Sequence, residues 1–288
     1  MHQLKTAIMK IKYFCPAWGS DALEFDRFCE KAAAAGYDGV EMGLPLDDDR
    51  DTTDRLEALK LYGLELVAQH HETHVPDLVA HQDEYRRRLE WLADAAPLLI
   101  NSHTGRDWFG FDDNNRLIDI AREVAMDRGV PIVHETHRGR FSFCAATTRR
   151  YLETHTDLRI AADFSHWCTV SESLLQDQPD AVELAISRAD HIHARVGHIE
   201  GPQVSDPRAP EWSNELNAHL AWWDRIVATH RERGSELLTV TSEFGPFPYM
   251  PRLPYTCQPV ASQWDINVHM MKLLRKRYAH NEASGDTK

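Results

Sequence analysis

The stretch that decides the fold prediction lies in the middle of the chain, where residues 129–140 read GVPIVHETHRGR. A segment with helical periodicity, residues 115–128, stops at Gly129, a residue type that readily closes a helix in the left-handed conformation. A short β-branched run follows, and it changes to polar residues from His134 onward. A helix followed by a short apolar strand with a polar end is typical of the parallel sheets of α/β proteins.

The same strand-and-helix unit recurs along the whole chain. We predict strands over residues 11–18, 39–43, 65–70, 98–103, 131–137, 159–166, 190–196 and 237–243. Helical periodicity between them is clearest over residues 21–35, 53–62, 115–128 and 212–233, each of which is followed by a glycine. Eight such units joined by right-handed crossovers close into a single (β/α)8 TIM barrel of class α/β, with an open doubly wound sheet as the alternative.

The length of 288 residues fits one such barrel, whose usual size is about 250 residues. We expect the barrel over residues 10–276, an N-terminal extension over residues 1–9 and a flexible, polar C-terminal tail over residues 277–288. The first ten residues lack the apolar core of a secretory signal. The five cysteines are scattered without a C-x-x-C pair, which favours reduced thiols and a cytoplasmic location.

The charge balance excludes several classes of partner. Lys and Arg number 32 and Asp and Glu 45, for a formal net charge of −13. Nucleic acids and anionic membrane surfaces are bound by basic patches, so we expect neither as a partner. No apolar stretch is long enough to span a bilayer. Histidine is abundant, at 17 residues, and it is a frequent metal ligand.

Four predicted strands have unusually polar carboxyl ends, which is where the active site of a (β/α)8 barrel forms. They read HETHRGR at 134–140, DFSHW at 163–167, HIHAR at 191–195 and TSEFG at 241–245. Side chains alternate between the two faces of a strand, so His191, His193 and Arg195 share one face. Burying charged side chains in a barrel costs free energy. A Glu, an Asp, a His and a second Glu from consecutive strands would offset this cost by holding a divalent cation. Three carboxylates and one imidazole suit Mn²⁺ or Mg²⁺, with Co²⁺ or Zn²⁺ as alternatives.

These motifs, taken in order, resemble a known family. AGYDGVE at 35–41, E-x-H at 135–137, D-x-x-H at 163–166, H-x-H at 191–193 and SEFG at 242–245 are similar to the xylose-isomerase-like sugar isomerase/epimerase superfamily of TIM barrels. The resemblance covers about residues 10–274. It implies that Glu135, Asp163, His193 and Glu243 are the metal ligands, that Glu135 and Glu243 also move protons, and that His166 contacts substrate.

The sequence departs from the ketose epimerases of that superfamily at one informative position. Their arginine six residues past the ligand histidine is replaced by Ile199, and an arginine stands only two residues on, at Arg195. We expect Arg195 to face the substrate, where it would pair with a carboxylate or phosphate, although it could instead neutralise the acids of the barrel. Substrate contacts are also predicted for His166, His137, His103 and Trp18. We expect His191 to pack behind the ligands.

The resemblance implies a divalent-metal-dependent isomerase or epimerase that acts on a small sugar or sugar-like polyhydroxy carbonyl compound by proton transfer through an enediolate. A metal-dependent dehydratase or lyase for an inositol or sugar-acid substrate is the alternative. An endonuclease IV-like phosphodiesterase and a non-catalytic sugar-binding barrel are further alternatives. The expected partner is a small carbohydrate, and the superfamily suggests a homodimer or homotetramer.

Overall fold

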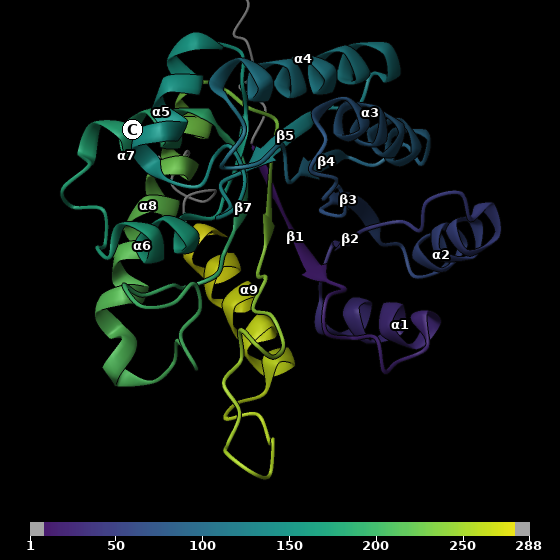
Figure 1. Ribbon diagram of the computed structural model, residues 1–288. Helices are drawn as coiled ribbons and strands as arrows, with labels where there is room; N and C mark the ends of the chain where they lie inside the picture. Colours follow the sequence, from purple (N-terminus) through teal and green to yellow (C-terminus); the bar gives the residue numbers. More distant parts are fainter. Residues whose placement is uncertain (1–8, 280–288) are drawn as a thin grey trace, which may run out of the picture.

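Eight parallel strands close into a barrel in the computed structural model, which describes residues 9–279 (Figure 1). The strands are β1 (Lys10–Pro16), β2 (Gly39–Met42), β3 (Glu65–His70), β4 (Leu99–Ser102), β5 (Ile132–Glu135), β6 (Ile160–Ala162), β7 (Ala189–His193) and β8 (Leu237–Thr241). They neighbour one another in sequence order, and the ring closes where Tyr13 of β1 pairs with Val240 of β8. The prediction of a single (β/α)8 barrel is therefore confirmed, and the open-sheet alternative is wrong.

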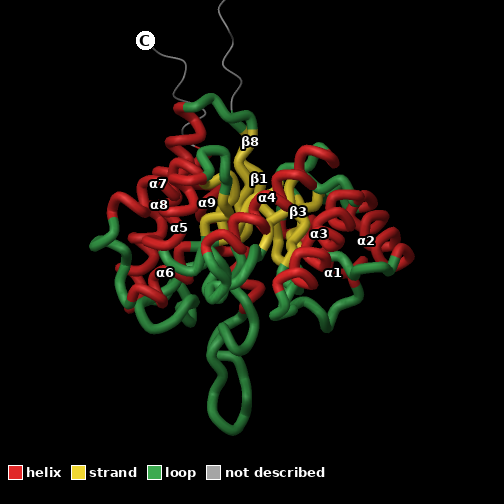
Figure 2. The backbone as a smooth tube through the Cα atoms, turned by 45° about the horizontal axis from the view of Figure 1, so that its top comes forward, coloured by secondary structure: helices red, strands yellow, loops and turns green. Residues whose placement is uncertain are grey.

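Helices surround the barrel and connect successive strands (Figures 1 and 2). They are α1 (Phe25–Ala35), α2 (Asp49–Leu61), α3 (Leu78–Asp94), α4 (Phe111–Arg128), α5 (Ala145–Thr154), α6 (Phe164–Ser171), α7 (Pro179–Arg188), α8 (Ser213–Glu232), which the short 3₁₀ turn η1 (Pro210–Trp212) precedes, and α9 (Gln263–Ala279). Gly36 and Gly129 close α1 and α4 in the left-handed conformation, as predicted, with φ of 96° and 67°. Within residues 9–279, no helix has the length and apolar character needed to cross a membrane.

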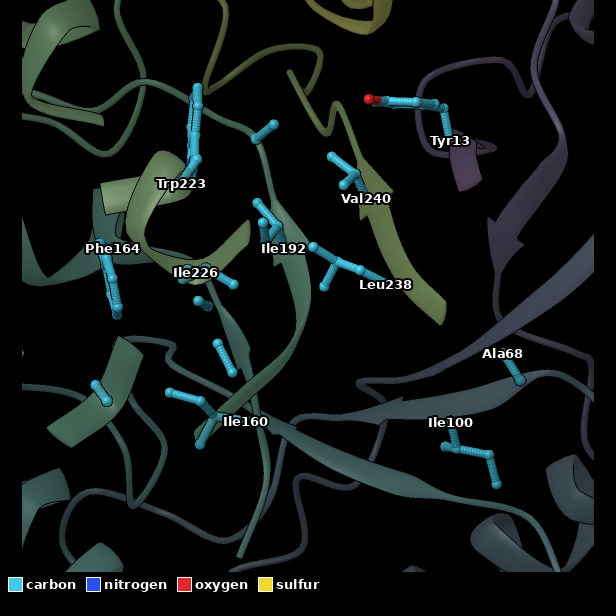
Figure 3. Close-up of a cluster of buried hydrophobic side chains, with 14 of the residues drawn as sticks. Tyr13, Ala68, Ile100, Ile160, Phe164, Ile192, Trp223, Ile226, Leu238 and Val240 are labelled. Carbon is cyan, nitrogen blue, oxygen red and sulfur yellow. The ribbon is translucent and has the colours of Figure 1, made fainter. Parts of the chain in front are cut away.

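The main core fills the space between the barrel and the helices. Figure 3 shows part of it, in which Ile160, Ile192 and Val240 of the strands face Phe164, Trp223 and Ile226 of the helices. A smaller apolar cluster consists of Phe14, Val67, Leu99, Val133 and Ala161, whose side chains alternate with those of the main core and so point into the barrel.

This inner cluster forms a floor for a polar layer. Two residues after Val67, Leu99, Val133 and Ala161, on the same inward face, come Gln69, Asn101, Glu135 and Asp163. The floor is closely packed, because a Cβ at Gly39 would lie only 2.3 Å from the Phe14 ring. The barrel interior is thus apolar below and polar at the carboxyl ends of the strands.

Three local predictions differ from the structure. β6 ends at Ala162, because Asp163 caps α6 by accepting a hydrogen bond from the Ser165 N–H at 3.1 Å, so His166 lies in a helix and not on a strand. Residues 277–279, expected in the tail, belong to α9, where Tyr278 is buried. Met9, expected in the extension, is buried in the core. Residues 1–8 and 280–288 lie outside the described residues.

The connection between β8 and α9 contains a projecting arm, which we define as residues 251–260. All ten of its residues are exposed. The arm extends away from the barrel below α9 in Figure 1 and at the bottom of Figure 2. A single bridge between Arg252 and Pro259 holds its two sides together.

Candidate functional site

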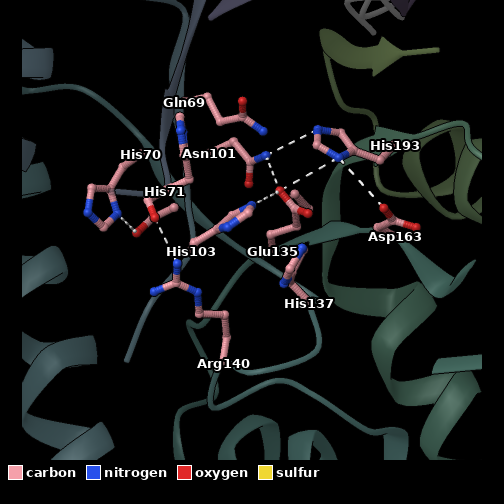
Figure 4. Close-up of polar contacts among 12 residues, drawn as sticks. Gln69, His70, His71, Asn101, His103, Glu135, His137, Arg140, Asp163 and His193 are labelled. Carbon is pink, nitrogen blue, oxygen red and sulfur yellow. Dashed lines mark hydrogen bonds and ion pairs between the residues drawn. The ribbon is translucent and has the colours of Figure 1, made fainter. Parts of the chain in front are cut away.

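The four predicted ligands, Glu135, Asp163, His193 and Glu243, converge at the carboxyl ends of β5 to β8. Figure 4 shows the first three of them. One ligand atom from each lies within 4.8 Å of the others. The Nδ1 atom of His193 lies 2.7 Å from Glu243 Oε2, 3.6 Å from Glu135 Oε2 and 4.0 Å from Asp163 Oδ2. None of the four side chains is more than 7% exposed.

The chemistry of these atoms fits a bound cation. Glu135 Oε1 is buried without a partner. His193 Nδ1 and Glu243 Oε2 are buried and make no well-aligned hydrogen bond, although they lie 2.7 Å from each other as an ion pair. Buried polar atoms in folded proteins almost always make hydrogen bonds, so three such atoms in one cluster mark a site that an ion would complete. Asp163 differs, because its carboxylate accepts hydrogen bonds from Ser165 and pairs with Arg195.

The electrostatics of the cluster reflect its burial. Burial raises the pKa of the Asp163 carboxyl to about 6, against the lowering effect of Arg195. Burial by itself would lower the pKa of His193, but the carboxylates of Glu243, Glu41 and Glu135 outweigh it and raise that pKa well above its usual value. The crowded acids therefore hold a proton on His193, and a divalent cation would take the place of that proton.

Each glutamate of the cluster has one oxygen that a neighbouring side chain anchors. Glu135 Oε2 accepts a hydrogen bond from Asn101 Nδ2 at 2.7 Å and lies 2.9 Å from His103 Nε2. Glu243 Oε1 accepts from Gln69 Nε2 at 3.3 Å. Of the other two oxygens, Glu135 Oε1 has no partner, and Glu243 Oε2 faces His193 Nδ1 at 2.7 Å, where a cation could take the place of the His193 proton.

The sequence analysis missed the role of Glu41 at the end of β2. This carboxylate is 3% exposed, and both of its oxygens lie near Nε2 of His193, at 3.0 and 3.1 Å. His191 Nε2 lies 3.2 Å from Glu41 Oε2, so His191 lies behind the ligands as expected. The signal was present, because Glu41 ends the AGYDGVE motif and the alternation of β2 points it into the barrel.

Arg195 does not present a free guanidinium to a substrate. It pairs with Asp163, lies 3.4 Å from Glu243 Oε2 and donates to His166 Nε2 at 2.8 Å. Burial would lower its pKa, but these carboxylates outweigh burial and raise it. The geometry thus matches the alternative prediction, in which Arg195 neutralises the acids of the barrel.

A cavity of about 600 Å³ opens above the cluster. Of the residues predicted to contact substrate, Trp18, His103, His137 and Arg195 line it. His166 is not among the lining residues; its side chain is fully buried beside His137, with ring centroids 3.9 Å apart. Burial lowers the pKa of all three histidines, His103, His137 and His166, well below the usual value, so they are neutral near pH 7.

Two further residues line the cavity: Tyr249, which the sequence analysis missed, and Arg140, which ends the polar motif at 134–140. Tyr249 comes from the β8–α9 connection, and its ring lies 4.8 Å from the Arg195 guanidinium and 5.0 Å from the Trp18 ring. Arg140 donates to the backbone carbonyls of Thr73 at 3.1 Å and His71 at 2.8 Å (Figure 4). It therefore fixes the loop that follows β3.

Comparison with known proteins agrees with the motifs. Residues 29–210, more than half of the chain, match the family model of the xylose isomerase-like TIM barrel. The chain belongs to this family. The family resemblance predicted from the strand-end motifs is therefore confirmed. None of the curated proteins matches the chain.

Solved structures of the xylose isomerase-like type share the fold. A D-allulose 3-epimerase from Methylomonas sp., in complex with D-allulose, is 15% identical with a TM-score of 0.60, and the match covers 94% of this chain and 98% of that one. A probable 3-DHS dehydratase from Bacillus anthracis is 18% identical with a TM-score of 0.60 and coverage of 93% and 100%. An L-ribulose 3-epimerase is 13% identical with a TM-score of 0.57 and coverage of 96% and 99%. At these identities the likeness concerns the fold alone.

Proposed function

We propose that the chain is a divalent-metal-dependent isomerase or epimerase for a small sugar or sugar-like polyhydroxy carbonyl compound. The observation that carries the proposal is the cluster of Glu135, Asp163, His193 and Glu243, in which three buried ligand atoms make no well-aligned hydrogen bond. The cavity above the cluster is of a size that suits a small carbohydrate. Likeness in fold to sugar epimerases supports the same class of reaction.

The proposed ion is Mn²⁺ or Mg²⁺, because three carboxylates and one imidazole form a predominantly oxygen donor set. Glu135, Asp163, His193 and Glu243 would hold it. When bound, a divalent cation supplies Lewis-acid polarisation of a carbonyl and stabilises the negative charge that develops on the substrate. The remaining chemistry belongs to the side chains of the chain.

Two glutamates are positioned to move protons. Glu135 ends β5 and Glu243 follows β8, so they approach the cluster from different strands, each with one oxygen that makes no well-aligned hydrogen bond. One carboxylate removes the proton next to the substrate carbonyl, and the other returns a proton to the opposite face or to the neighbouring carbon. The anchors from Asn101, His103 and Gln69 keep both carboxylates oriented while a proton moves.

The cavity walls would orient the substrate. Trp18 and Tyr249 provide apolar faces on one side, and the neutral rings of His103 and His137 provide hydrogen-bonding groups on the other. We include His166 in the proposed site only as support for His137 and Arg195, since it does not line the cavity. A dehydratase would need an acid at the leaving hydroxyl, and the position of His166 makes it unsuitable for that role.

The test is proton–deuterium exchange in D₂O with a panel of ketoses, sugar acids and inositol derivatives. We expect exchange next to a carbonyl for at least one compound, dependent on added Mn²⁺ or Mg²⁺ and abolished by chelation. A product with one water fewer would instead identify a dehydratase. Tight sugar binding without exchange would identify a non-catalytic barrel, and about three ions per chain with phosphodiester cleavage would identify a nuclease.

A further inference from the structure

A buried chain of hydrogen-bonding groups runs from β8 through β7 to β2. Thr239 Oγ1 lies 2.7 Å from His191 Nδ1, and His191 Nε2 lies 3.2 Å from Glu41 Oε2. The Glu41 carboxylate in turn contacts His193 Nε2 at 3.0 and 3.1 Å. All four side chains are buried, with exposures of 3% or less. This chain ends at the one histidine of the proposed metal site.

The chemistry of the groups assigns the protons along this chain. An ionised carboxylate accepts hydrogen bonds and donates none, so Nε2 of both His191 and His193 must carry a hydrogen. The Thr239 hydroxyl contacts the other ring nitrogen of His191, Nδ1, at 2.7 Å.

The same assignment determines which nitrogen of His193 faces the cavity. With Nε2 directed at Glu41, Nδ1 points toward the oxygens of Glu135, Asp163 and Glu243, of which Glu243 Oε2 is nearest at 2.7 Å. A histidine that binds a metal through one nitrogen commonly donates its other N–H to a carboxylate, which orients the ring and increases its basicity. The geometry of Glu41 and His193 has this form.

We propose that Glu41, oriented by His191 and Asn101, is a positioning residue that fixes His193 in the Nε2–H tautomer and directs the Nδ1 lone pair at the metal site. This inference rests on the proposed function only for the place of the metal. Asn101 supports the arrangement, because its Nδ2 donates to Glu41 Oε1 at 2.9 Å and to Glu135 Oε2 at 2.7 Å. One amide thus holds the positioning carboxylate and a proposed ligand together.

A second cation bound by Glu41, His191 and His193 is the competing explanation, since these residues also lie close enough to share an ion. The amide of Asn101 argues against it. Its Nδ2 group lies 3.1 Å from His193 Nε2 and donates to Glu41, so an N–H donor points at the place where the ion would sit. The two explanations differ in the number of ions bound per chain.

The first experiment measures Mn²⁺ binding to the metal-free protein by isothermal titration calorimetry. We expect one ion per chain, and we expect Glu41→Gln to weaken its affinity by about 10- to 100-fold, the usual effect of removing such a partner. The matched control is Glu65→Gln, which removes a carboxylate at the amino end of β3 that pairs with Lys12 at 2.6 Å. This variant should bind Mn²⁺ like the wild type. Thr239→Val, at the far end of the chain of groups, should weaken the affinity less than Glu41→Gln.

The second experiment reads the tautomer directly by NMR of Zn²⁺-loaded protein labelled with ¹⁵N in histidine. We expect His193 to carry its hydrogen on Nε2 and to bind through Nδ1 in the wild type. This measurement needs no variant, so it decides the inference even where Glu41→Gln fails to fold. Binding through Nε2, or undiminished Mn²⁺ affinity of Glu41→Gln, would overturn it. Two ions falling to one in Glu41→Gln would make Glu41 a ligand, and a wild type without affinity for divalent cations would contradict the proposed function itself.

Discussion

The two ends of the barrel both contain cavities lined by charged side chains, but among the described residues that line them, only those at the carboxyl end include buried polar atoms without a well-aligned hydrogen bond. At the amino ends of the strands, a cavity of about 390 Å³ is lined by apolar residues together with Asp190, His230 and Arg233. Asp190 pairs with Arg233 and lies 3.5 Å from Arg159, and His230 lies 2.7 Å from a backbone carbonyl oxygen. Among the described residues that line this cavity, no buried side-chain nitrogen or oxygen lacks a partner.

At the carboxyl ends, by contrast, Glu135, His193 and Glu243 each contribute a buried atom that makes no well-aligned hydrogen bond. Charge and burial are therefore found at both ends, and neither property identifies the functional end. What distinguishes the carboxyl end is this group of incompletely satisfied polar atoms, which is the condition for binding something that the chain does not contain. The following predictions test this difference.

The largest effect is expected for Glu243→Gln. The change keeps the shape of the side chain but removes the charge that faces His193 Nδ1 at 2.7 Å, so bound metal should be lost and proton exchange should fall by at least about a thousandfold. Metal content after dialysis and exchange in D₂O are the measurements. Glu236→Gln, an exposed carboxylate at the amino end of the same strand, is the matched control and should change neither. A fully metallated, active Glu243→Gln protein would remove this residue from the site.

Arg195→Ala should destabilise the protein in a way that depends on metal. Removing one partner of a buried ion pair lowers the free energy of unfolding by about 3–5 kcal/mol, because Asp163 loses its counter-charge. A bound cation would restore part of that charge, so the loss should be larger without metal than with it. Chemical denaturation of both forms measures the difference, and Arg195→Lys should recover part of the loss. A selective rise in KM for acidic substrates would instead show that the guanidinium contacts substrate.

The pH dependence of metal affinity should reveal the two protons at the carboxyl end. His193 has a raised pKa and must lose a proton before it can bind the metal ion. The affinity for Mn²⁺ should therefore fall by roughly tenfold for each unit by which the pH is lowered near neutrality. Asp163 protonates as the pH falls through about 6, so the decline should steepen below that value. Mn²⁺ titrations between pH 5 and 8 provide the measurement. An affinity that stays constant over this range would contradict the assignment of both residues.

The smallest effect is expected at the amino end. Asp190→Asn breaks partly exposed ion pairs with Arg233 and Arg159, which are worth up to about 1 kcal/mol. We expect the melting temperature to fall by only a few degrees. Bound metal and proton exchange should be unchanged. Lost exchange in this variant would mean that the two ends are coupled, and it would weaken the contrast drawn above.

The sequence was informative wherever periodicity and position along a strand determine the outcome. Glycines after helical segments and the recurring β-branched runs predicted the barrel, and alternation predicted that Glu135 and His193 face inward. Glu41 was overlooked because the residues after it, including Met42 and Leu44, are apolar, so the end of β2 does not look like a site. A single acidic residue at one strand end indicates a functional site only once the folded barrel places its histidine partners next to it.

Other features depend on geometry that no local pattern contains. His166 was placed on a strand because DFSH was interpreted as the polar end of the strand, but Asp163 caps a helix and turns the chain first. The alternation of side chains along the strand predicted which face Arg195 occupies. It could not predict that the long Arg195 side chain forms an ion pair with Asp163. Tyr249 reaches the cavity from a long irregular connection, and the path of such a segment has no periodicity to read.

The projecting arm also makes the chain easy to cut without dismantling the molecule. Arg252 is exposed in a stretch of ten exposed residues, which is the kind of segment that trypsin attacks first. The cut would fall after β8, so the ring of eight strands, including its closure between β1 and β8, would remain in one fragment. The other fragment would carry α9, which contacts β1 and buries Ile266, Met270 and Leu274. A nicked protein should therefore migrate as two pieces under denaturing conditions and as one particle in native buffer.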